Sequence, residues 1–195
     1  MKLSELMGVK SHLQHRPERH RVEDVLMSRG FRKMGSGGFG SVWEVPGKPY
    51  VLKLFDVDDT AYEEFVTMAQ RSNFNPHFPM FRGSPIPLTP QVRAIRMERL
   101  KPLNINWASA LQRGIGVILE AIPLGSNWQE DAQEQFNERE LRDMQLALRK
   151  WPRLAEAAQM LIDLYNLSDR AEWDLHHQNV MLRGSTPVFT DPFAV

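Results

Sequence analysis

The chain contains no cysteine among its 195 residues, which excludes a disulfide scaffold, a thiolate nucleophile and any metal site built on thiolates. It also lacks an apolar run of the roughly 18 residues that a membrane-spanning helix requires, and its first residues lack the apolar core of a signal peptide. Neither sign of charge is in excess, since 24 Lys and Arg balance 24 Asp and Glu. We therefore expect a cytoplasmic protein with neither nucleic acid nor membrane as a partner.

The hydrophobic pattern changes its period near Leu100, from that of strands to that of helices. Alternation and turn residues predict short strands over 31–34, 41–45, 50–55 and 92–97, with a proline-broken loop around short strands between the last two. Helical spacing predicts helices over 22–27, 60–70, 104–114, 127–150 and 153–167, followed by a strand, loop and strand over 179–191. We expect an α+β chain with an N-terminal extension and helix over 1–29, a β-rich part over 30–100 and a helical part over 101–195.

A glycine-rich turn lies between the first two predicted strands, at Gly35, Gly37, Gly38 and Gly40. Alone, such a pattern is typical of a flexible hairpin. The glycines lead into a strand through Val42 and not into a helix, which excludes a dinucleotide-binding turn, and no Gly-Lys-Ser/Thr follows to make a Walker loop. This context favours a lid over ATP phosphates, because the missing side chains let backbone amides approach the phosphate oxygens.

Lys53 lies on the predicted strand that follows the glycine hairpin. A lysine on a strand is usually solvated, but at this place it is a candidate for pairing the α- and β-phosphates of ATP. Such a lysine needs an acidic partner, and the helix predicted over 60–70 offers Glu63 and Glu64. We expect Glu64, as the residue nearer the apolar face of that helix, with Glu63 as the fallback. An ordinary solvated helix face carrying both glutamates is the alternative.

A third cluster of polar residues lies towards the end of the sequence. Asp174 and Asn179 are five positions apart, ahead of an apolar strand, and Asp191 follows the next short strand. Asp174 can accept the proton of an attacking hydroxyl, and the side-chain oxygen of Asn179 can bind Mg²⁺. Asp191 would bridge Mg²⁺ to the phosphates. Phe193 lies two residues further on, like the aromatic residue that packs behind the metal-binding aspartate of kinases.

In this order the motifs resemble the signature of protein kinases. Residues 174–181 and 190–192 look closer still to the early serine/threonine kinases of podovirus-type bacteriophages, and the resemblance runs from about residue 30 to the C-terminus. It implies a bilobal protein-kinase-like fold, with a small antiparallel β-rich N-lobe, a reduced and mainly helical C-lobe, and ATP and Mg²⁺ as cofactors. It also makes Met97 the gatekeeper and assigns the adenine to the backbone of Glu98 and Leu100.

The sequence departs from the kinase pattern at several positions. Glu172 and Trp173 replace the histidine and arginine that usually precede the catalytic aspartate. His176 stands where protein kinases usually carry lysine and where small-molecule phosphotransferases resembling the aminoglycoside kinases carry histidine. Pro192 replaces the phenylalanine of Asp-Phe-Gly, and only four residues follow Asp191, so the sequence shows no activation segment to hold a peptide.

The resemblance implies transfer of the γ-phosphoryl group of ATP to serine or threonine hydroxyls of proteins, expected to be host proteins during phage infection. Asp174, Lys53 and Glu64 are then catalytic, while Asn179 and Asp191 hold the metal. The nucleotide is held by the glycine turn and the residues on the strands, that is Gly35, Gly37, Gly38, Gly40, Val42, Lys53, Met97, Glu98 and Leu100. Two alternatives stay open: a small-molecule phosphotransferase, and a catalytically silent kinase-like module that binds and inhibits a host protein.

Overall fold

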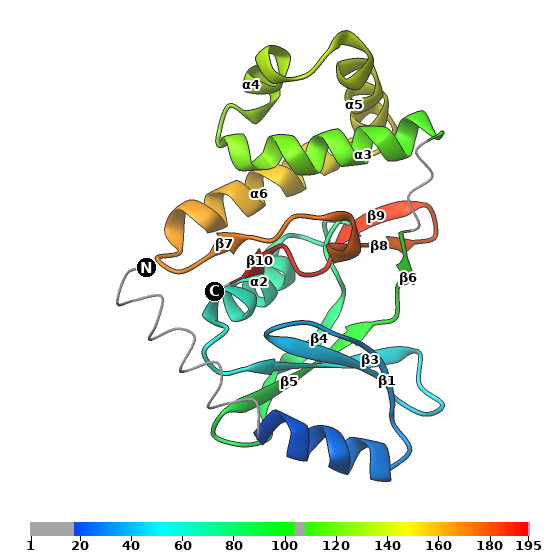
Figure 1. The fold of residues 1–195 in the computed structure, drawn as a ribbon, viewed down its shortest axis with the longest axis vertical. Coiled ribbons are helices and arrows are strands. Elements are labelled where there is room, and N and C mark those ends of the chain that lie inside the picture. The colour runs from blue at the N-terminus through cyan, green and yellow to red at the C-terminus, as the bar shows by residue number, and fades with distance from the viewer. Residues whose placement is uncertain (1–17, 104–107, 195) are drawn as a thin grey trace. The chain divides into compact units, whose positions relative to one another are not determined.

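A computed structural model of the chain describes residues 18–103 and 108–194 (Figure 1). The fold is α+β, as predicted, with one five-stranded antiparallel sheet, two smaller sheets and a set of helices. The described chain divides into two units, one formed by the residues up to Thr60 together with Phe81–Arg99, the other by Ala61–Met80 together with Leu100 and the residues after it. No helix in these described ranges is long and apolar enough to cross a membrane.

The first unit is an antiparallel sheet preceded by a helix over residues 18–28. Its strands lie in the order β1-β2-β3-β5-β4. They are β1 (Arg32–Ser36), β2 (Gly40–Glu44), β3 (Tyr50–Asp56), β4 (Phe81–Pro87) and β5 (Val92–Glu98). Apart from the connection between β3 and β4, each strand is joined to its successor by a short turn, as the glycine and proline positions predict.

The helix over residues 18–28 covers one face of this sheet. Leu26 of the helix is buried in a cluster with Trp43 of β2 and Leu54 of β3, and with Val92 and Ala94 of β5. Because successive side chains of a strand point to opposite faces, Lys53 lies on the other face of β3. The sheet therefore has one face that is packed on a helix and one that carries the predicted lysine.

Glu23 gives the same helix a polar attachment to the sheet. The Glu23 carboxylate lies 3.0 Å from the ammonium of Lys33 on β1. The residue as a whole is only 5% exposed. Burial raises the pKa of Glu23, but hydrogen bonds from Ser41 and Lys33, with the charges of Lys33 and Arg19, outweigh it and leave the pKa below its usual value. The carboxylate is thus held in its ionised form against the start of β2.

The second unit is mainly helical, with short strands. Its helices are α2 (Thr60–Arg71, within the unit from Ala61), α3 (Ala110–Ala121), η1 (Ile122–Leu124), α4 (Trp128–Gln135), α5 (Glu138–Lys150), α6 (Leu154–Leu167) and η2 (His177–Asn179). A three-stranded sheet has the order β6-β8-β9, and β7 pairs with β10. These strands are β6 (Lys101–Pro102), β7 (Glu172–Trp173), β8 (Val180–Arg183), β9 (Thr186–Phe189) and β10 (Phe193–Ala194).

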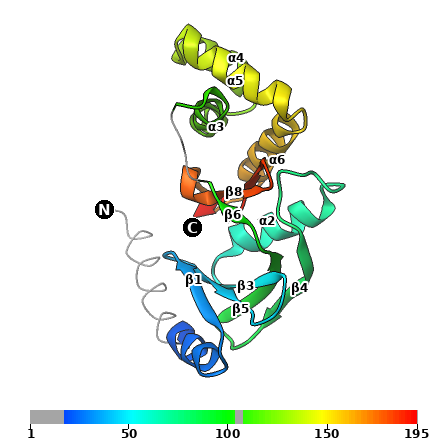
Figure 2. The same ribbon diagram turned by 90° about the vertical axis from the view of Figure 1, so that its right-hand side faces the viewer.

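Helices α3 and α5 approach closely at Gly114 (Figure 2). A Cβ atom on Gly114 would overlap the backbone carbonyl of Asp143, so only glycine permits this spacing. Beside this contact, Nε of Arg113 donates to the Asp143 carboxylate at 2.7 Å. Gly114 therefore lies inside a helix, whereas the sequence predicts a helix over 104–114 that ends there. Residues 104–107 of that prediction lie outside the described residues.

Two further predictions about elements are wrong in part. The region predicted as loop around short strands holds the seven-residue strand β4, which tolerates Pro85 and Pro87 because it lies at the edge of the sheet. The single helix predicted over 127–150 is two helices, because Asn137 begins a new one: its side chain accepts the N–H of Glu140, and the Glu140 carboxylate accepts the N–H of Asn137.

The division into units also differs from the predicted parts 1–29, 30–100 and 101–195. The helix over 18–28 belongs with the sheet, and residues 61–80 belong with the helical second unit. Packing explains the second difference, since Phe65 of α2 contacts Phe78 and Phe193 in edge-to-face geometry, at ring separations of 5.9 and 6.5 Å. Residues 1–17 lie outside the described residues.

His77 is buried beneath the β8–β9 hairpin and connects it to the segment that follows α2. Its ring Nδ1 donates to the carbonyl of Pro187 at 2.7 Å, and its own carbonyl accepts the N–H of Phe189 at 2.9 Å. Burial lowers the pKa of His77 below its ordinary 6.5. The bond to Pro187 opposes this effect, the nearby charges of Arg183 and Arg153 add to it, and Glu156 opposes it weakly. The imidazole is therefore neutral in the fold at pH 7.

We predict that the stability of the protein falls as the pH is lowered from about 7 to about 5. In that range the unfolded chain binds a proton at position 77 more readily than the folded protein does, so protonation favours unfolding. Urea denaturation at a series of pH values measures the effect. His77→Gln should flatten this part of the profile, whereas the control His20→Gln, on a side chain that is 70% exposed, should not. An unchanged slope in His77→Gln would contradict the prediction.

Candidate functional site

The glycine turn is the tip of the β1–β2 hairpin. Gly35 pairs with Val42 across the hairpin, and Gly37 N–H donates to the Gly40 carbonyl at 2.9 Å. A Cβ on Gly40 would overlap the carbonyl oxygen of Leu54 on the neighbouring strand, so this glycine is required by the fold. A Cβ on Gly35 or Gly37 would meet no atom of the described residues within 4 Å. These two glycines leave open space beside the turn.

Lys53, Val42 and Met97 share the face of the sheet opposite the helix over 18–28. Val42 is directly across from Lys53, which faces Ile95 on its other side, and Met97 is the partner of Val51 in the same register. Lys53 is 5% exposed and Met97 3%. A Cβ on Gly40 would lie 3.3 Å from Cε of Lys53, so the lysine stem runs beside the glycine hairpin. The structure thus brings these predicted nucleotide-binding residues together.

The remaining predicted adenine contacts follow at the end of β5. Glu98 is its last residue and is partly buried, whereas Leu100 is buried and belongs to the second unit. On α2, Glu64 is exposed and Glu63 is partly buried. The reason for preferring Glu64, its place nearer the apolar face, is therefore wrong, because the buried residues of α2 begin at 61 and 62 and recur one turn later at 65 and 66.

Asp174 and Asn179 are joined directly in the second unit. The side-chain nitrogen of Asn179 donates to the backbone carbonyl of Asp174 at 2.7 Å and to its carboxylate at 2.9 Å. These two bonds close the loop that runs from β7 through η2 to β8. Because the amide nitrogen faces Asp174, the amide oxygen of Asn179 is directed to the other side of the group. This is the atom that a hard cation such as Mg²⁺ would use.

His176 lies on the same loop, against the other oxygen of the Asp174 carboxylate. Its Nδ1 accepts the backbone N–H of Gln178 at 3.2 Å, so the neutral ring carries its hydrogen on Nε2. Nε2 lies 3.2 Å from Asp174 Oδ1, and also 3.2 Å from the Asn179 amide nitrogen. The second contact joins two donors and is not a hydrogen bond in this tautomer. Asn179 therefore binds one carboxylate oxygen of Asp174, and the ring of His176 lies beside the other.

Asp191 is placed beside this loop by the residues on either side of it. Thr190 donates its N–H to the Asn179 carbonyl at 2.8 Å and its hydroxyl to the same oxygen at 3.0 Å. Pro192 accepts the N–H of Asp174 at 3.0 Å. Asp191 is thus held between two bonds from Thr190 to residue 179 and one bond from residue 174 to Pro192. The structure brings together the three polar residues that the sequence predicts to act in this half of the site.

Aromatic packing supports the loop from behind. Phe193 is buried and packs on Trp173 at a ring separation of 5.1 Å, and on Phe65 of α2. Trp173 in turn stacks on Tyr165 of α6, with ring centroids 4.6 Å apart and planes inclined by 15°. Trp173, which stands in place of the usual arginine, therefore fixes the start of the loop by apolar contact.

The predicted metal ligands are one carboxylate and one amide, Asp191 and Asn179. The described residues contain no group of three or more His, Cys, Asp and Glu side chains that could hold a metal ion. Two oxygen ligands suit Mg²⁺, which usually retains waters and completes its octahedron with substrate phosphates. The donor set therefore fits Mg²⁺ bound together with a nucleotide, and not a closed structural metal site.

Three residues that support the candidate site have no supporting role in the sequence analysis. Thr190 and Trp173 hold the loop, and Arg19 contacts the glycine turn through its bond to the Gly38 carbonyl at 3.0 Å. The signal for Arg19 is its helical spacing with Glu23 and Leu26, which places all three on the buried face of the helix. Thr190 and Trp173 give no such signal, because their contacts depend on chain segments that are distant in sequence.

Comparison of the chain with protein-family models, with curated proteins and with solved structures finds no match. The two residue sets described above are therefore the basis for the function. One set lies on a sheet face of the first unit and comprises Val42, Lys53 and Met97 beside the glycine turn. The other lies on the loop of the second unit and comprises Asp174, Asn179 and Asp191.

We predict that alanine has different effects at Gly40 and at Gly37. Gly40→Ala should lower the free energy of unfolding by about 1–3 kcal/mol, because its Cβ would overlap the neighbouring strand. Gly37→Ala should leave stability nearly unchanged, because its Cβ enters open space, and should instead weaken the binding of any ligand that uses the turn. Denaturant titration and nucleotide titration of both variants check this. Equal losses of stability would contradict it.

Proposed function

We propose that the chain is an ATP- and Mg²⁺-dependent protein kinase that transfers the γ-phosphoryl group to serine or threonine hydroxyls. The first unit is the N-lobe of a kinase-like fold and the second unit is a reduced C-lobe. The protein substrates belong to a host cell infected by a bacteriophage, in line with the resemblance of residues 174–181 and 190–192 to the early phage kinases.

The observation that carries the proposal is the joining of Asp174, Asn179 and Asp191 within one loop assembly. Asn179 bonds to Asp174 at 2.7 and 2.9 Å, and backbone bonds fix the residues on both sides of Asp191. Three side chains with these functional groups could be scattered over an ordinary helical domain. Their convergence supplies a proton acceptor next to two oxygen ligands for a cation, which is the equipment that phosphoryl transfer requires.

In this proposal Asp174 orients the attacking hydroxyl and receives its proton as the oxygen bonds to phosphorus. The bond from the γ-phosphorus to the bridging oxygen breaks, and ADP leaves. Asn179 donates to one carboxylate oxygen of Asp174, and the His176 ring lies 3.2 Å from the other, so together they restrict the direction in which Asp174 presents its remaining lone pairs. The contribution of the loop is mainly positioning, since this reaction requires little covalent work from a protein.

The first unit contributes the groups that hold the nucleotide. Lys53 is the cation for the α- and β-phosphates, and the glycine turn beside its stem leaves space for them. Val42 and Met97 supply apolar surface on the same face of the sheet for the adenine. The kinase resemblance assigns Lys53 an acidic partner on α2, for which the partly buried Glu63 is now a better candidate than the exposed Glu64. Mg²⁺, when bound by Asn179 and Asp191, supplies charge neutralisation for the phosphates.

The contact of His176 with Asp174 favours a second candidate, a small-molecule phosphotransferase. The histidine stands where such enzymes carry one, and the structure places its Nε2 3.2 Å from the Asp174 carboxylate. Parallel assays with casein-like proteins on one side and with sugars, aminoglycosides and nucleosides on the other separate the two candidates. A silent binding module is the third outcome, recognised by the absence of ATP turnover with every acceptor.

We predict that Asp174→Asn abolishes phosphoryl transfer and leaves ATP binding intact. The amide cannot accept the hydroxyl proton, and the groups assigned to the nucleotide are unchanged. Transfer from radiolabelled ATP to protein in a lysate measures the first effect, and equilibrium titration with ATP measures the second. The matched control is Asp169→Asn, the same substitution at an exposed aspartate five residues earlier. Undiminished labelling by Asp174→Asn would refute the role of this residue.

We predict that Asp191→Ala removes the dependence of ATP binding on Mg²⁺. Its carboxylate is the charged member of the proposed ligand pair, and an amide alone is a weak site for this cation. ATP titrations with Mg²⁺ and with EDTA should differ for the wild type and coincide for the variant. If the two titrations of the variant still differ as in the wild type, Asp191 does not hold the metal.

A further inference from the structure

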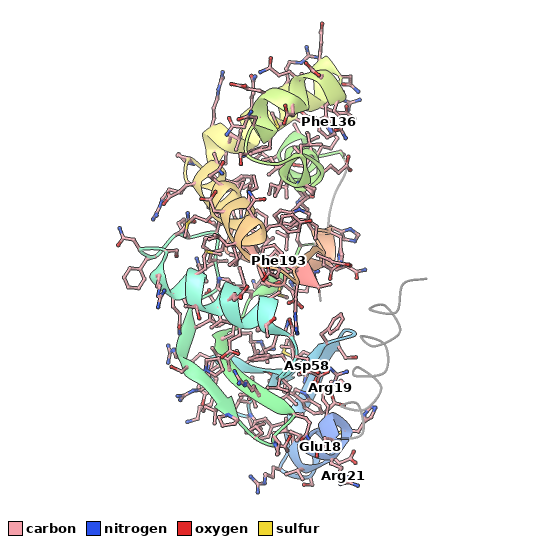
Figure 3. All side chains as sticks on the ribbon, turned by 90° about the vertical axis from the view of Figure 1, so that its left-hand side faces the viewer. Glu18, Arg19, Arg21, Asp58, Phe136 and Phe193 are labelled. Atoms are coloured by element: carbon pink, nitrogen blue, oxygen red, sulfur yellow. The ribbon has the colours of Figure 1, made fainter. Side chains whose placement is uncertain are left out.

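Arg19, on the helix that precedes the sheet, contacts two different parts of the first unit. Its Nη1 lies 2.9 Å from the carboxylate of Asp56 at the end of β3, and its Nη2 donates to the carbonyl of Gly38 in the glycine turn at 3.0 Å. Arg19 is 7% exposed and Asp56 2%. Figure 3 shows the contrast along the helix, with Arg19 directed to the sheet and Arg21 directed away from it.

Two neighbouring carbonyls of the turn are therefore fixed. The Gly38 carbonyl is directed to Arg19, and the Phe39 carbonyl accepts the backbone N–H of Asp56 at 3.2 Å. The described peptide bonds are trans, and in a planar trans peptide the N–H points opposite to the C=O. The N–H of Phe39 is thus directed away from Arg19, and the N–H of Gly40 away from β3.

The two sides of the Gly38–Phe39 peptide belong to opposite faces of the sheet. Arg19 comes from the helix that packs against Trp43 and Leu54, so the Gly38 carbonyl is directed to that face. The opposite side of the same peptide is the side of Lys53 and Val42. A peptide N–H held on the side of a lysine is a donor for an anion.

We infer that Arg19 is a positioning residue for phosphate binding, which sets the Gly38–Phe39 peptide so that its N–H donates to a phosphate of the bound nucleotide. This inference rests on the proposed function and deepens it, since the sequence assigns no role to the helix over 18–28. Without the arginine, the glycines near this peptide, at positions 37, 38 and 40, leave it free to rotate. The entropy of fixing it would then count against phosphate binding.

The shape of the guanidinium explains why an arginine is needed. Its two terminal nitrogens serve two acceptors at once, one charged and one neutral, in a fixed plane. A lysine at position 19 is a single point charge, and we expect it to keep the ion pair with Asp56 and to lose the bond to Gly38. Arg19→Lys thus separates the support of the fold from the positioning of the turn.

The test compares the affinities of the full chain for ATP, ADP and adenosine in the presence of Mg²⁺. Arg19→Lys should bind ATP and ADP about tenfold more weakly than the wild type, the loss expected for one charge-assisted hydrogen bond, and should bind adenosine equally well. Arg21→Lys, the same change at an exposed arginine of the same helix, should leave all three affinities unchanged. Because Arg19→Gln leaves the Asp56 carboxylate buried without its guanidinium, the double variant Arg19→Gln/Asp56→Asn is the second probe, with the same expected loss.

Each outcome decides between the proposals. Selective loss of ATP and ADP affinity in the folded variants supports the role of Arg19. Equal weakening for adenosine would assign Arg19 to the stability of the unit, and unchanged ATP affinity would remove the inference, while both leave the proposed kinase function standing. If the wild type binds neither ATP nor adenosine, the proposed function fails and the inference fails with it.

Discussion

The candidate site depends on the side-chain amide of Asn179. Its nitrogen bridges the backbone and the carboxylate of Asp174, and its backbone carbonyl receives both donors of Thr190. One residue thus connects three segments: the loop after β7, the start of β8 and the chain that leaves β9. One hydrogen bond makes a net contribution of only about 1 kcal/mol to the stability of a protein. Loss of the bonds of Asn179, however, would leave the carboxylates of both Asp174 and Asp191 without a fixed orientation. The importance of Asn179 therefore lies in orientation more than in stability.

In the first unit, the cationic side chain of Lys53 is nearly buried on a small sheet. Side chains alternate between the two faces along β3, so Leu54 packs against the helix over 18–28 and Lys53 lies on the other face. The helix completes the apolar packing of its face, so that the opposite face can carry a lysine and a hairpin of glycines. The same helix reaches the glycine turn through Arg19. Packing on one face and ligand geometry on the other are thereby linked through a single element.

Sequence patterns predicted the strands around the glycine turn, α2 and α6 well, because the hydrophobic periodicity and the positions of the turn residues agree there. They failed where a tertiary contact decides. Gly114 looks like a helix end in the sequence but permits the approach of α5, and Pro85 is tolerated because β4 lies at an edge, which no local pattern reveals. Asn137 is a different case, since its pattern with Glu140 is a recognisable capping box that hydrophobic periodicity alone conceals.

For the candidate site, residue types and order predicted a set of side chains that the structure brings together, whereas the contacts that orient them were not predictable. Asp174, Asn179 and Asp191 carry functional groups whose chemistry is local, so they can be read from the sequence. Trp173 and Thr190 act through partners on other elements. The reason for ranking Glu64 above Glu63 was wrong, because the buried residues of α2 at 61, 62, 65, 66 and 69 leave Glu64 on the exposed side.

The replacement of an arginine by Trp173 also changes how the loop is held. An arginine before Asp174, as the kinase pattern has it, would join the loop to charged groups, and its contribution would vary with salt and with phosphorylation nearby. Trp173 instead lies between Tyr165 and Phe193, at ring separations of 4.6 and 5.1 Å. Such contacts depend on buried area and ring geometry and are insensitive to ionic strength. The loop geometry is thus built into the packing of the second unit and requires no charged modification to form.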